Sequence, residues 1–276
     1  MASKISKERT ISSVILVIIA MATILPGGPI LAVTLYLISN VAFLELTKAC
    51  GIHSDKKINA LEITGILAIA AYYLLIFFAK THTYFMITVI LLLMALMFVY
   101  VFAFPRFTAN QVMATYFSLM YAPIMLSFIF LTRELEYGVY LVWMIFISSW
   151  ISDTCAYLVG VLMGKHKLVP QLSPKKTIEG SIGGILGSAL VGALFGFFLL
   201  DKTFGGNQFG IMLFIIGAIG SVISQVGDLA ASAIKRNHDI KDYGNLIPGH
   251  GGIMDRFDSV IFTAPMIYFL VIIFLM

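Results

Sequence analysis

Long runs of apolar residues alternate along the chain with short polar segments. A helix needs about 20 predominantly apolar residues to cross a bilayer, and nine runs of suitable length are present. They predict membrane-spanning helices at approximately 11–26, 29–49, 60–79, 83–104, 111–132, 137–163, 179–200, 208–234 and 258–276. Residues 26–29 (Pro-Gly-Gly-Pro) predict a tight turn between the first two, because proline cannot continue a helix from within. We therefore expect an all-α polytopic membrane protein.

The composition supports this class. Of 276 residues, 60% are hydrophobic and 12% are charged, whereas about 25% are charged in an ordinary soluble domain. Mean hydropathy is +0.98. A soluble fold of this size lacks the interior to hide so many apolar side chains, so soluble, disordered and disulfide-rich secreted classes are excluded. Cys50 and Cys155 lie in separate apolar stretches and are interpreted as small buried residues.

The distribution of Lys and Arg predicts the orientation, since basic residues are retained on the cytoplasmic side. With the N-terminus in the cytoplasm, Lys80, Arg133 and Lys202 are the only three of the 18 basic residues that fall outside. The other 15 fall in cytoplasmic segments, and removing one crossing would scramble this division. The net charge of +4 is thus explained by topology and a local anion site, and nucleic-acid binding is not expected.

The chain changes character near its middle. We expect residues 1–136 to form a scaffold of about five helices that packs and could support a homodimer, since its polar residues (Asn40, Glu45, Glu62, Asn110) are sparse. Residues 137–276 carry carboxylates, glycines and two basic cytoplasmic loops, 164–178 and 235–257. We expect the chemistry in this second region.

Small residues recur every four positions in the seventh predicted span, at Gly180, Gly184, Ser188, Gly192 and Gly196. They share one helix face and favour close packing of another helix. The sixth and eighth spans place Asp153 and Asp228 on comparable faces. A carboxylate at membrane depth costs about 2.5–3.5 kcal/mol and needs a partner or a wet cavity. An ion pair with a lysine would satisfy one such Asp, whereas two of them favour a shared functional cavity.

Two basic clusters suit anions. The first, before the seventh span, contains Ser173, Lys175, Lys176 and Thr177, and a helix N-terminus presents free N–H groups to phosphate. Thr177 could instead be a plain N-cap, and the lysines could serve topology or anionic lipid.

The second cluster combines the basic residues Lys235, Arg236, Lys241 and Arg256 with a glycine-rich turn over 248–252. Asp255 and Asp258 share a helix face and, with Asp228 and Asp153, could form an all-oxygen site for a hard cation such as Mg²⁺. No Cys/His pattern suits zinc, and the absence of GxxxxGK[ST] disfavours a P-loop ATPase.

Residues 232–258 resemble the signature of phosphatidate cytidylyltransferases (CDP-diacylglycerol synthases). The matching pattern is Ser-x-x-Lys-Arg, then Lys-Asp, then Pro-Gly-His-Gly-Gly-x-x-Asp-Arg-x-Asp. Residues 153–157 and 173–180 also look like family motifs. Ala231 departs from the family, where many relatives carry Glu, and Ile178 replaces a common Trp. The specific resemblance covers about residues 148–260, and the remainder is similar in hydropathy.

The resemblance implies that CTP and phosphatidate give CDP-diacylglycerol and pyrophosphate at the cytoplasmic face of the cell (inner) membrane, among membrane lipids. Mg²⁺ would be held by Asp228 and Asp255 with support from Asp153 and Asp258, and a second cation is conceivable. Asp228, Asp255, Asp258, Lys235, Arg236 and Arg256 are the expected catalytic residues. Expected substrate-binding residues are Ser173, Lys175, Lys176, Thr177, Ser232, Lys241, Asp242, Gly249, His250, Gly251 and Gly252.

His250 invites assignment as a general base. A phosphate monoester has a second pKa of about 6 and is largely a dianion at pH 7, so it hardly needs deprotonation. We therefore expect His250 to bind phosphate or stabilise the turn.

Two other functions remain open from the sequence. A CTP-dependent polyprenol kinase of the dolichol-kinase type resembles this family in its C-terminal region and would release CDP. A cation-coupled transporter could use Asp153 and Asp228 as a relay, although the charged residues crowd one predicted mouth and no inverted repeat is visible.

Overall fold

The structure is a computed structural model that describes residues 14–52, 57–80, 83–205, 208–247 and 251–275. These residues are almost entirely helical. They divide into two compact units. Unit 1 comprises Met1–Glu134 with His238–Arg256, and unit 2 comprises Leu135–Asn237 with Phe257–Met276.

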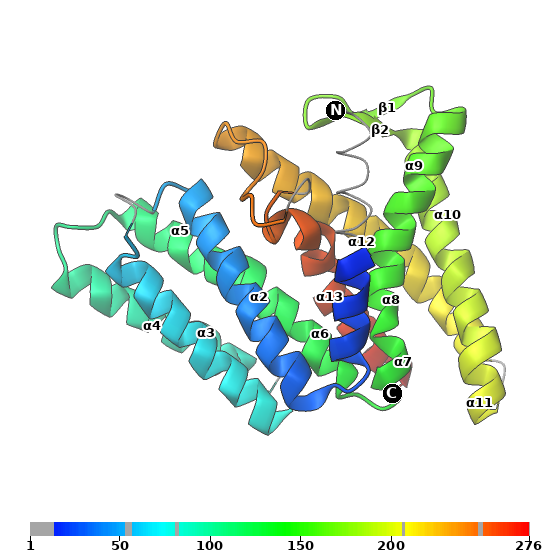
Figure 1. The fold of residues 1–276 in the computed structure, drawn as a ribbon, viewed down its shortest axis with the longest axis horizontal. Helices are drawn as coiled ribbons and strands as arrows, with labels where there is room; N and C mark the ends of the chain where they lie inside the picture. The colour runs from blue at the N-terminus through cyan, green and yellow to red at the C-terminus, as the bar shows by residue number, and fades with distance from the viewer. Residues whose placement is uncertain (1–13, 53–56, 81–82, 206–207, 248–250, 276) are drawn as a thin grey trace. The chain divides into compact units, whose positions relative to one another are not determined.

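The helices of unit 1 are α2 (Gly28–Ala49), α3 (Ala60–Ala79), α4 (Phe85–Phe102), α5 (Ala109–Leu119), η1 (Met120–Ile124) and α6 (Met125–Arg133). Helices α2, α3 and α4 pack side by side in sequence order (Figure 1). The elements α5, η1 and α6 form one apolar stretch that widens into a π-helix at Pro123, which lacks an N–H donor. A shorter apolar helix, Val14–Ile24, precedes α2.

Unit 2 begins with α7 (Gly138–Leu141), α8 (Trp143–Phe146), η2 (Ile147–Ile151) and α9 (Ser152–Met163). An antiparallel hairpin of β1 (Lys167–Val169) and β2 (Ser173–Thr177) follows. The remaining helices are α10 (Ile178–Phe195), η3 (Gly196–Asp201), α11 (Lys202–Phe204), α12 (Phe209–Asn237) and α13 (Met254–Leu275), the last of which belongs to unit 2 from Phe257. Figure 1 shows α9 and α10 side by side, with the hairpin at one end of the pair.

Glycines permit the close helix contacts of unit 2. A Cβ added at Gly180 would lie 2.7 Å from the Ala156 carbonyl oxygen on α9, and one at Gly217 would lie 2.7 Å from the Ser188 carbonyl oxygen on α10. Backbone atoms cannot move aside as a side chain can. The small-residue face predicted for the seventh span is therefore confirmed, and it holds α10 between α9 and α12.

Eight helical stretches in the described residues are long and apolar enough to cross a membrane. They coincide with the second to ninth predicted spans, and the first predicted span corresponds to the shorter helix Val14–Ile24. The prediction of an all-α polytopic membrane protein is thus confirmed. The turn at residues 26–29 is also present: Gly27 has a φ of 65° and precedes α2.

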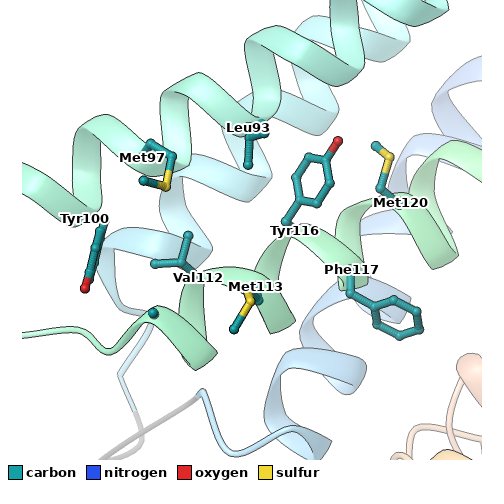
Figure 2. Close-up of a pocket in the computed structure, with 9 residues that line it drawn as sticks. Leu93, Met97, Tyr100, Val112, Met113, Tyr116, Phe117 and Met120 are labelled. Carbon is teal, nitrogen blue, oxygen red and sulfur yellow. The ribbon is translucent and has the colours of Figure 1, made fainter.

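Unit 1 contains an apolar cavity between α4 and α5 of about 330 Å³. Figure 2 shows Leu93 and Met97 facing Val112 and Tyr116 across it. None of its lining residues is charged. The cavity can offer dispersion contacts to an apolar group but no acid–base or phosphate chemistry, so the candidate site lies elsewhere.

Candidate functional site

The basic hairpin leads directly into the N-terminus of α10. Thr177 is buried at the end of β2, and its hydroxyl accepts a hydrogen bond from the Gly180 N–H at 3.1 Å. It is therefore the N-cap that the sequence offered as one reading. Capping does not exclude anion binding, because other N–H groups of the first turn have no partner within the helix.

Glu179 fastens the start of the hairpin to the same helix end. Its carboxylate accepts hydrogen bonds from the backbone N–H groups of Lys165 and His166 at 3.1 and 3.2 Å. It also contacts Nδ1 of His166 at 2.6 Å. A single acidic side chain thus ties the chain leaving α9 to the first turn of α10, and this restricts the lysine-bearing hairpin between them.

A pocket of about 380 Å³ lies beside the N-terminus of α10 in unit 2. Three lysines line it, Lys167, Lys175 and Lys176, together with Asp153 and Thr177. Three positive charges beside a helix N-terminus produce a local environment that favours a polyanion. The lysines of the first basic cluster therefore line a cavity, and their predicted role in binding an anion stays a prediction.

Three aspartates of unit 2, Asp153, Asp228 and Asp258, lie near these lysines. Asp228 on α12 forms an ion pair with Lys176. The carboxyl of Asp258 lies close enough to interact electrostatically with Asp228, Asp153 and the Lys235 ammonium. The structure thus brings together the three predicted acidic residues of unit 2 with two of the predicted basic residues. Like charges in one cluster repel, and the Lys176 and Lys235 ammonium groups offset part of this repulsion.

The residues of this cluster fit a hard cation in chemistry but are not arranged as a finished ligand set. Carboxylate oxygens are the donors that Mg²⁺ prefers. The buried Ser224 hydroxyl, one turn before Asp228 on α12, has no hydrogen-bond partner in the described part of the chain. However, Asp228 is paired with Lys176, and no group of three or more His, Cys, Asp or Glu side chains is close enough to hold a metal among the described residues.

Asp255 belongs to unit 1, where it organises the glycine-rich segment. Its Oδ2 accepts hydrogen bonds from the Tyr243 N–H at 2.8 Å and from the Gly252 N–H at 3.0 Å. Gly251 has a φ of 84°, and a Cβ there would lie 2.7 Å from that same oxygen. The residue type at 251 is therefore dictated both by backbone conformation and by the approach of Asp255.

Glu45 on α2 reaches the same segment. Its two carboxylate oxygens accept hydrogen bonds from the N–H groups of Ile253 at 3.1 Å and Met254 at 2.8 Å. More than 200 residues separate these partners in the sequence. Sequence analysis assigned Glu45 to the scaffold and missed this contact, although the rule applied to Asp153 and Asp228, that a carboxylate within an apolar span needs a partner, applies equally here.

The remaining predicted site residues occupy the ends of these elements. Ser173 lies on β2, Ser232 is partly buried one turn after Asp228 on α12, and Arg236 is exposed in the last turn of α12. Lys241 and Asp242 are exposed in unit 1, and Arg256 is partly buried there, near the start of α13.

Gly249 and His250 lie outside the described residues, so their predicted roles stay predictions. Glu179 and Lys167 were not among the predicted site residues, although Lys167 falls in the predicted loop 164–178 and Glu179 in the family-like motif 173–180.

Comparison with known proteins gives the family. The model of the Cytidylyltransferase family matches residues 7–274. A phosphatidate cytidylyltransferase of Staphylococcus saprophyticus is 33% identical over 273 residues, which cover 96% of this chain and 99% of the relative. The Bacillus subtilis protein of the same name is 30% identical, with 97% and 98% covered, and that of Staphylococcus aureus is 34% identical, with 96% and 99% covered. The chain therefore belongs to the Cytidylyltransferase family.

Proposed function

We propose that this protein makes CDP-diacylglycerol and pyrophosphate from CTP and phosphatidate. The observation that carries the proposal is the full-length similarity to proteins named phosphatidate cytidylyltransferase, at 30–34% identity. In the reaction, a phosphate oxygen of phosphatidate forms a bond to the α-phosphorus of CTP. The bond from that phosphorus to the β-phosphate oxygen breaks, and pyrophosphate leaves with the electron pair.

The pocket of unit 2 suits the nucleotide in this reaction. Two polyanions must approach each other, so cationic groups have the largest effect on the barrier. Lys167, Lys175 and Lys176 line the pocket beside the N-terminus of α10. We assign the triphosphate to these lysines, with Lys235 as a further charge beside Asp258.

Magnesium is part of the proposal. Asp228, Asp258 and Asp153 are the groups of unit 2 that would hold it, and Asp255 remains a predicted ligand from the family motif. When bound, Mg²⁺ would neutralise phosphate oxygens and the departing pyrophosphate. Because the Lys176 ammonium pairs with Asp228, we expect Lys176 to give up this partner when a divalent cation binds and to turn toward the nucleotide phosphates.

We also propose that the site faces the cytoplasm of a cell membrane. The support is the distribution of basic residues along the sequence, together with the identity of the substrates. CTP is a soluble cytoplasmic nucleotide, whereas phosphatidate is a lipid. A site near the inner boundary of the bilayer gives both of them access.

The test is pyrophosphate release by the purified protein in mixed micelles, with CTP, phosphatidate and Mg²⁺ each omitted in turn. We expect one pyrophosphate for each CDP-diacylglycerol and no release when any component is absent. Release of CDP with a polyprenol acceptor would overturn the proposal in favour of a kinase. Substrate movement into liposomes without chemistry would overturn it in favour of a transporter.

A matched pair of variants links the reaction to the site. Asp228→Asn is expected to reduce pyrophosphate release at least 100-fold while the protein folds. Asp201→Asn is the control, because Asp201 is equally an aspartate of unit 2 but caps the start of α12 through the N–H groups of Phe209 and Gly210. We expect it to lower thermal stability and to leave turnover of the folded protein unchanged. Equal turnover in the two variants would show that Asp228 does not take part in the reaction.

A further inference from the structure

The strongest unassigned feature is the contact of Glu45 with the glycine-rich segment of unit 1. Glu45 lies on α2, in the region that sequence analysis treats as scaffold. Its two oxygens accept hydrogen bonds from consecutive backbone N–H groups, those of Ile253 and Met254. Met254 is the first residue of α13. A carboxylate from another helix therefore satisfies N–H groups at the start of α13 that have no partner within that helix.

The segment is shaped around this carboxylate. A Cβ added at Gly252 would overlap both carboxylate oxygens of Glu45, and a Cβ added at Gly244 would overlap one of them. Glycine at these two positions is what lets the backbone approach the Glu45 side chain from two sides. The fit between the Glu45 carboxylate and the segment is therefore specific, beyond a single hydrogen bond.

Two carboxylates divide the N–H groups of the segment between them. The Gly252 N–H donates to Asp255, whereas the next two N–H groups donate to Glu45. Glu45 also lies within electrostatic range of Asp255. The backbone before Asp255 is thus fixed by hydrogen bonds to both carboxylates. We therefore expect a change at Glu45 to alter the position of the Asp255 side chain.

We propose that Glu45 is a positioning residue for the cytidylyl transfer reaction: it holds residues 252–255 in the conformation in which Asp255 and Arg256 act. The proposal rests on the function proposed above, in which the family motif containing these two residues takes part in the reaction. It gives α2 a role in the conformation of the family motif within unit 1. Removing a residue that orients a metal ligand through hydrogen bonds typically lowers metal affinity or activity by about 10- to 100-fold.

The test compares Glu45→Gln and Glu45→Ala with Glu62→Gln. Glu62 is the matched control, because it is also a buried carboxylate of unit 1 that accepts a backbone N–H, that of Asn59 in the capping box of α3. We expect Glu45→Gln to keep one of the two hydrogen bonds and to lose about tenfold in kcat. Glu45→Ala should lose more, and both should need more Mg²⁺ for half-maximal rate. Glu62→Gln should lower thermal stability only.

A second measurement addresses the shape of the contact. Gly252→Ala is expected to displace the Glu45 carboxylate and so to impair the same step as Glu45→Ala. The double variant should then be no worse than the poorer single variant, because both changes remove one interaction. Multiplied losses in the double variant would show that the two residues act separately and would overturn the proposal.

The outcomes separate this inference from the proposed function. Asp255→Asn is measured alongside. If Asp255→Asn loses activity while Glu45→Gln keeps the kcat and Mg²⁺ dependence of the parent, the inference fails and the proposed function stands. If both variants keep parental kinetics, the inference fails together with the assigned role of Asp255. If Glu45→Ala does not fold, the isosteric Gln variant alone decides. Loss of kcat with a shifted Mg²⁺ dependence, absent from Glu62→Gln, supports the inference.

Discussion

Replacing Lys176 with Met would remove a positive charge that is paired with Asp228 and keep a similar length of apolar side chain. In the structure the two side chains form an ion pair and are 25% and 26% exposed. The Asp228 carboxylate would then face the charges of Asp258 and Asp153 without this partner. We expect lower stability, a stronger response to Mg²⁺ and weaker use of CTP.

The expected loss of stability follows from the burial of the pair. An exposed ion pair contributes about 0–1 kcal/mol, whereas a hydrogen bond to a charged group contributes about 1.5–3 kcal/mol. A pair that is one-quarter exposed falls between these limits, so we expect a loss of about 1–2 kcal/mol. For a protein of this size, each kcal/mol lowers Tm by about 2–4 °C.

The assay is thermal unfolding of the purified protein in detergent, with and without Mg²⁺, combined with initial rates over a range of CTP concentrations. Without Mg²⁺, Lys176→Met should unfold at a lower temperature than the parent protein. Added Mg²⁺ should raise the Tm of the variant more than that of the parent, because the cation compensates a larger excess of negative charge. The KM for CTP should increase.

The control is Lys202→Met, which removes a lysine of unit 2 from the face of Phe198, 5.0 Å from the ring centroid. An exposed cation–π contact contributes about 0.5–1 kcal/mol, so its Tm should fall less and its KM and Mg²⁺ response should not change. The reasoning would be refuted if Lys176→Met matched the parent protein in Tm without Mg²⁺, in the Mg²⁺-induced shift and in KM.

Three further substitutions test other contacts. Thr177→Ala should cost about 1 kcal/mol through loss of the N-cap while Thr177→Ser keeps it, and equal Tm values for the two would contradict capping. Gly217→Ala should destabilise by about 1–3 kcal/mol, because the new methyl group meets a backbone carbonyl of α10; an unchanged Tm would show that α10 and α12 can separate without cost. Arg133→Met should lower Tm through loss of hydrogen bonds to the carbonyl oxygens of Ile24 and Leu25 at 2.9 and 3.1 Å, and an Arg133→Lys variant that restores no stability would tie the effect to the guanidinium shape.

Much of the fold is predictable because the bilayer imposes one simple rule. A run of about 20 apolar residues must become a helix when no water is available for its backbone. That rule places the described helices within a few residues, including the turn before α2. It does not reveal irregular turns within a span. The π-helices at Met120–Ile124, Ile147–Ile151 and Gly196–Asp201 depend on local packing that hydropathy does not encode.

The candidate site is predictable only where its residues are close in sequence or carry charge into an apolar span. Lys175 and Lys176 of the hairpin and Asp228 were identified in this way. Glu45 was not assigned to the site, because its partners are the backbone N–H groups of Ile253 and Met254. Every residue except proline has such a group, so the side-chain types at 253 and 254 do not indicate the contact. Apolar faces in a membrane protein contact lipid and protein alike, so the pattern does not say which helix lies next to which.

The composition of unit 1 has a consequence for dividing the protein. Its second stretch, His238–Arg256, is inserted between two helical segments of unit 2. A fragment ending at residue 134 would lack the N–H groups of Ile253 and Met254 and would leave the partly buried Glu45 carboxylate without these hydrogen bonds. Chimaeras that exchange the first 134 residues between relatives should therefore succeed when the donor supplies its own version of 238–256 as well. The two units are distinct in their contacts, but because unit 1 consists of two separate stretches of the chain, no single truncation point divides the protein into them.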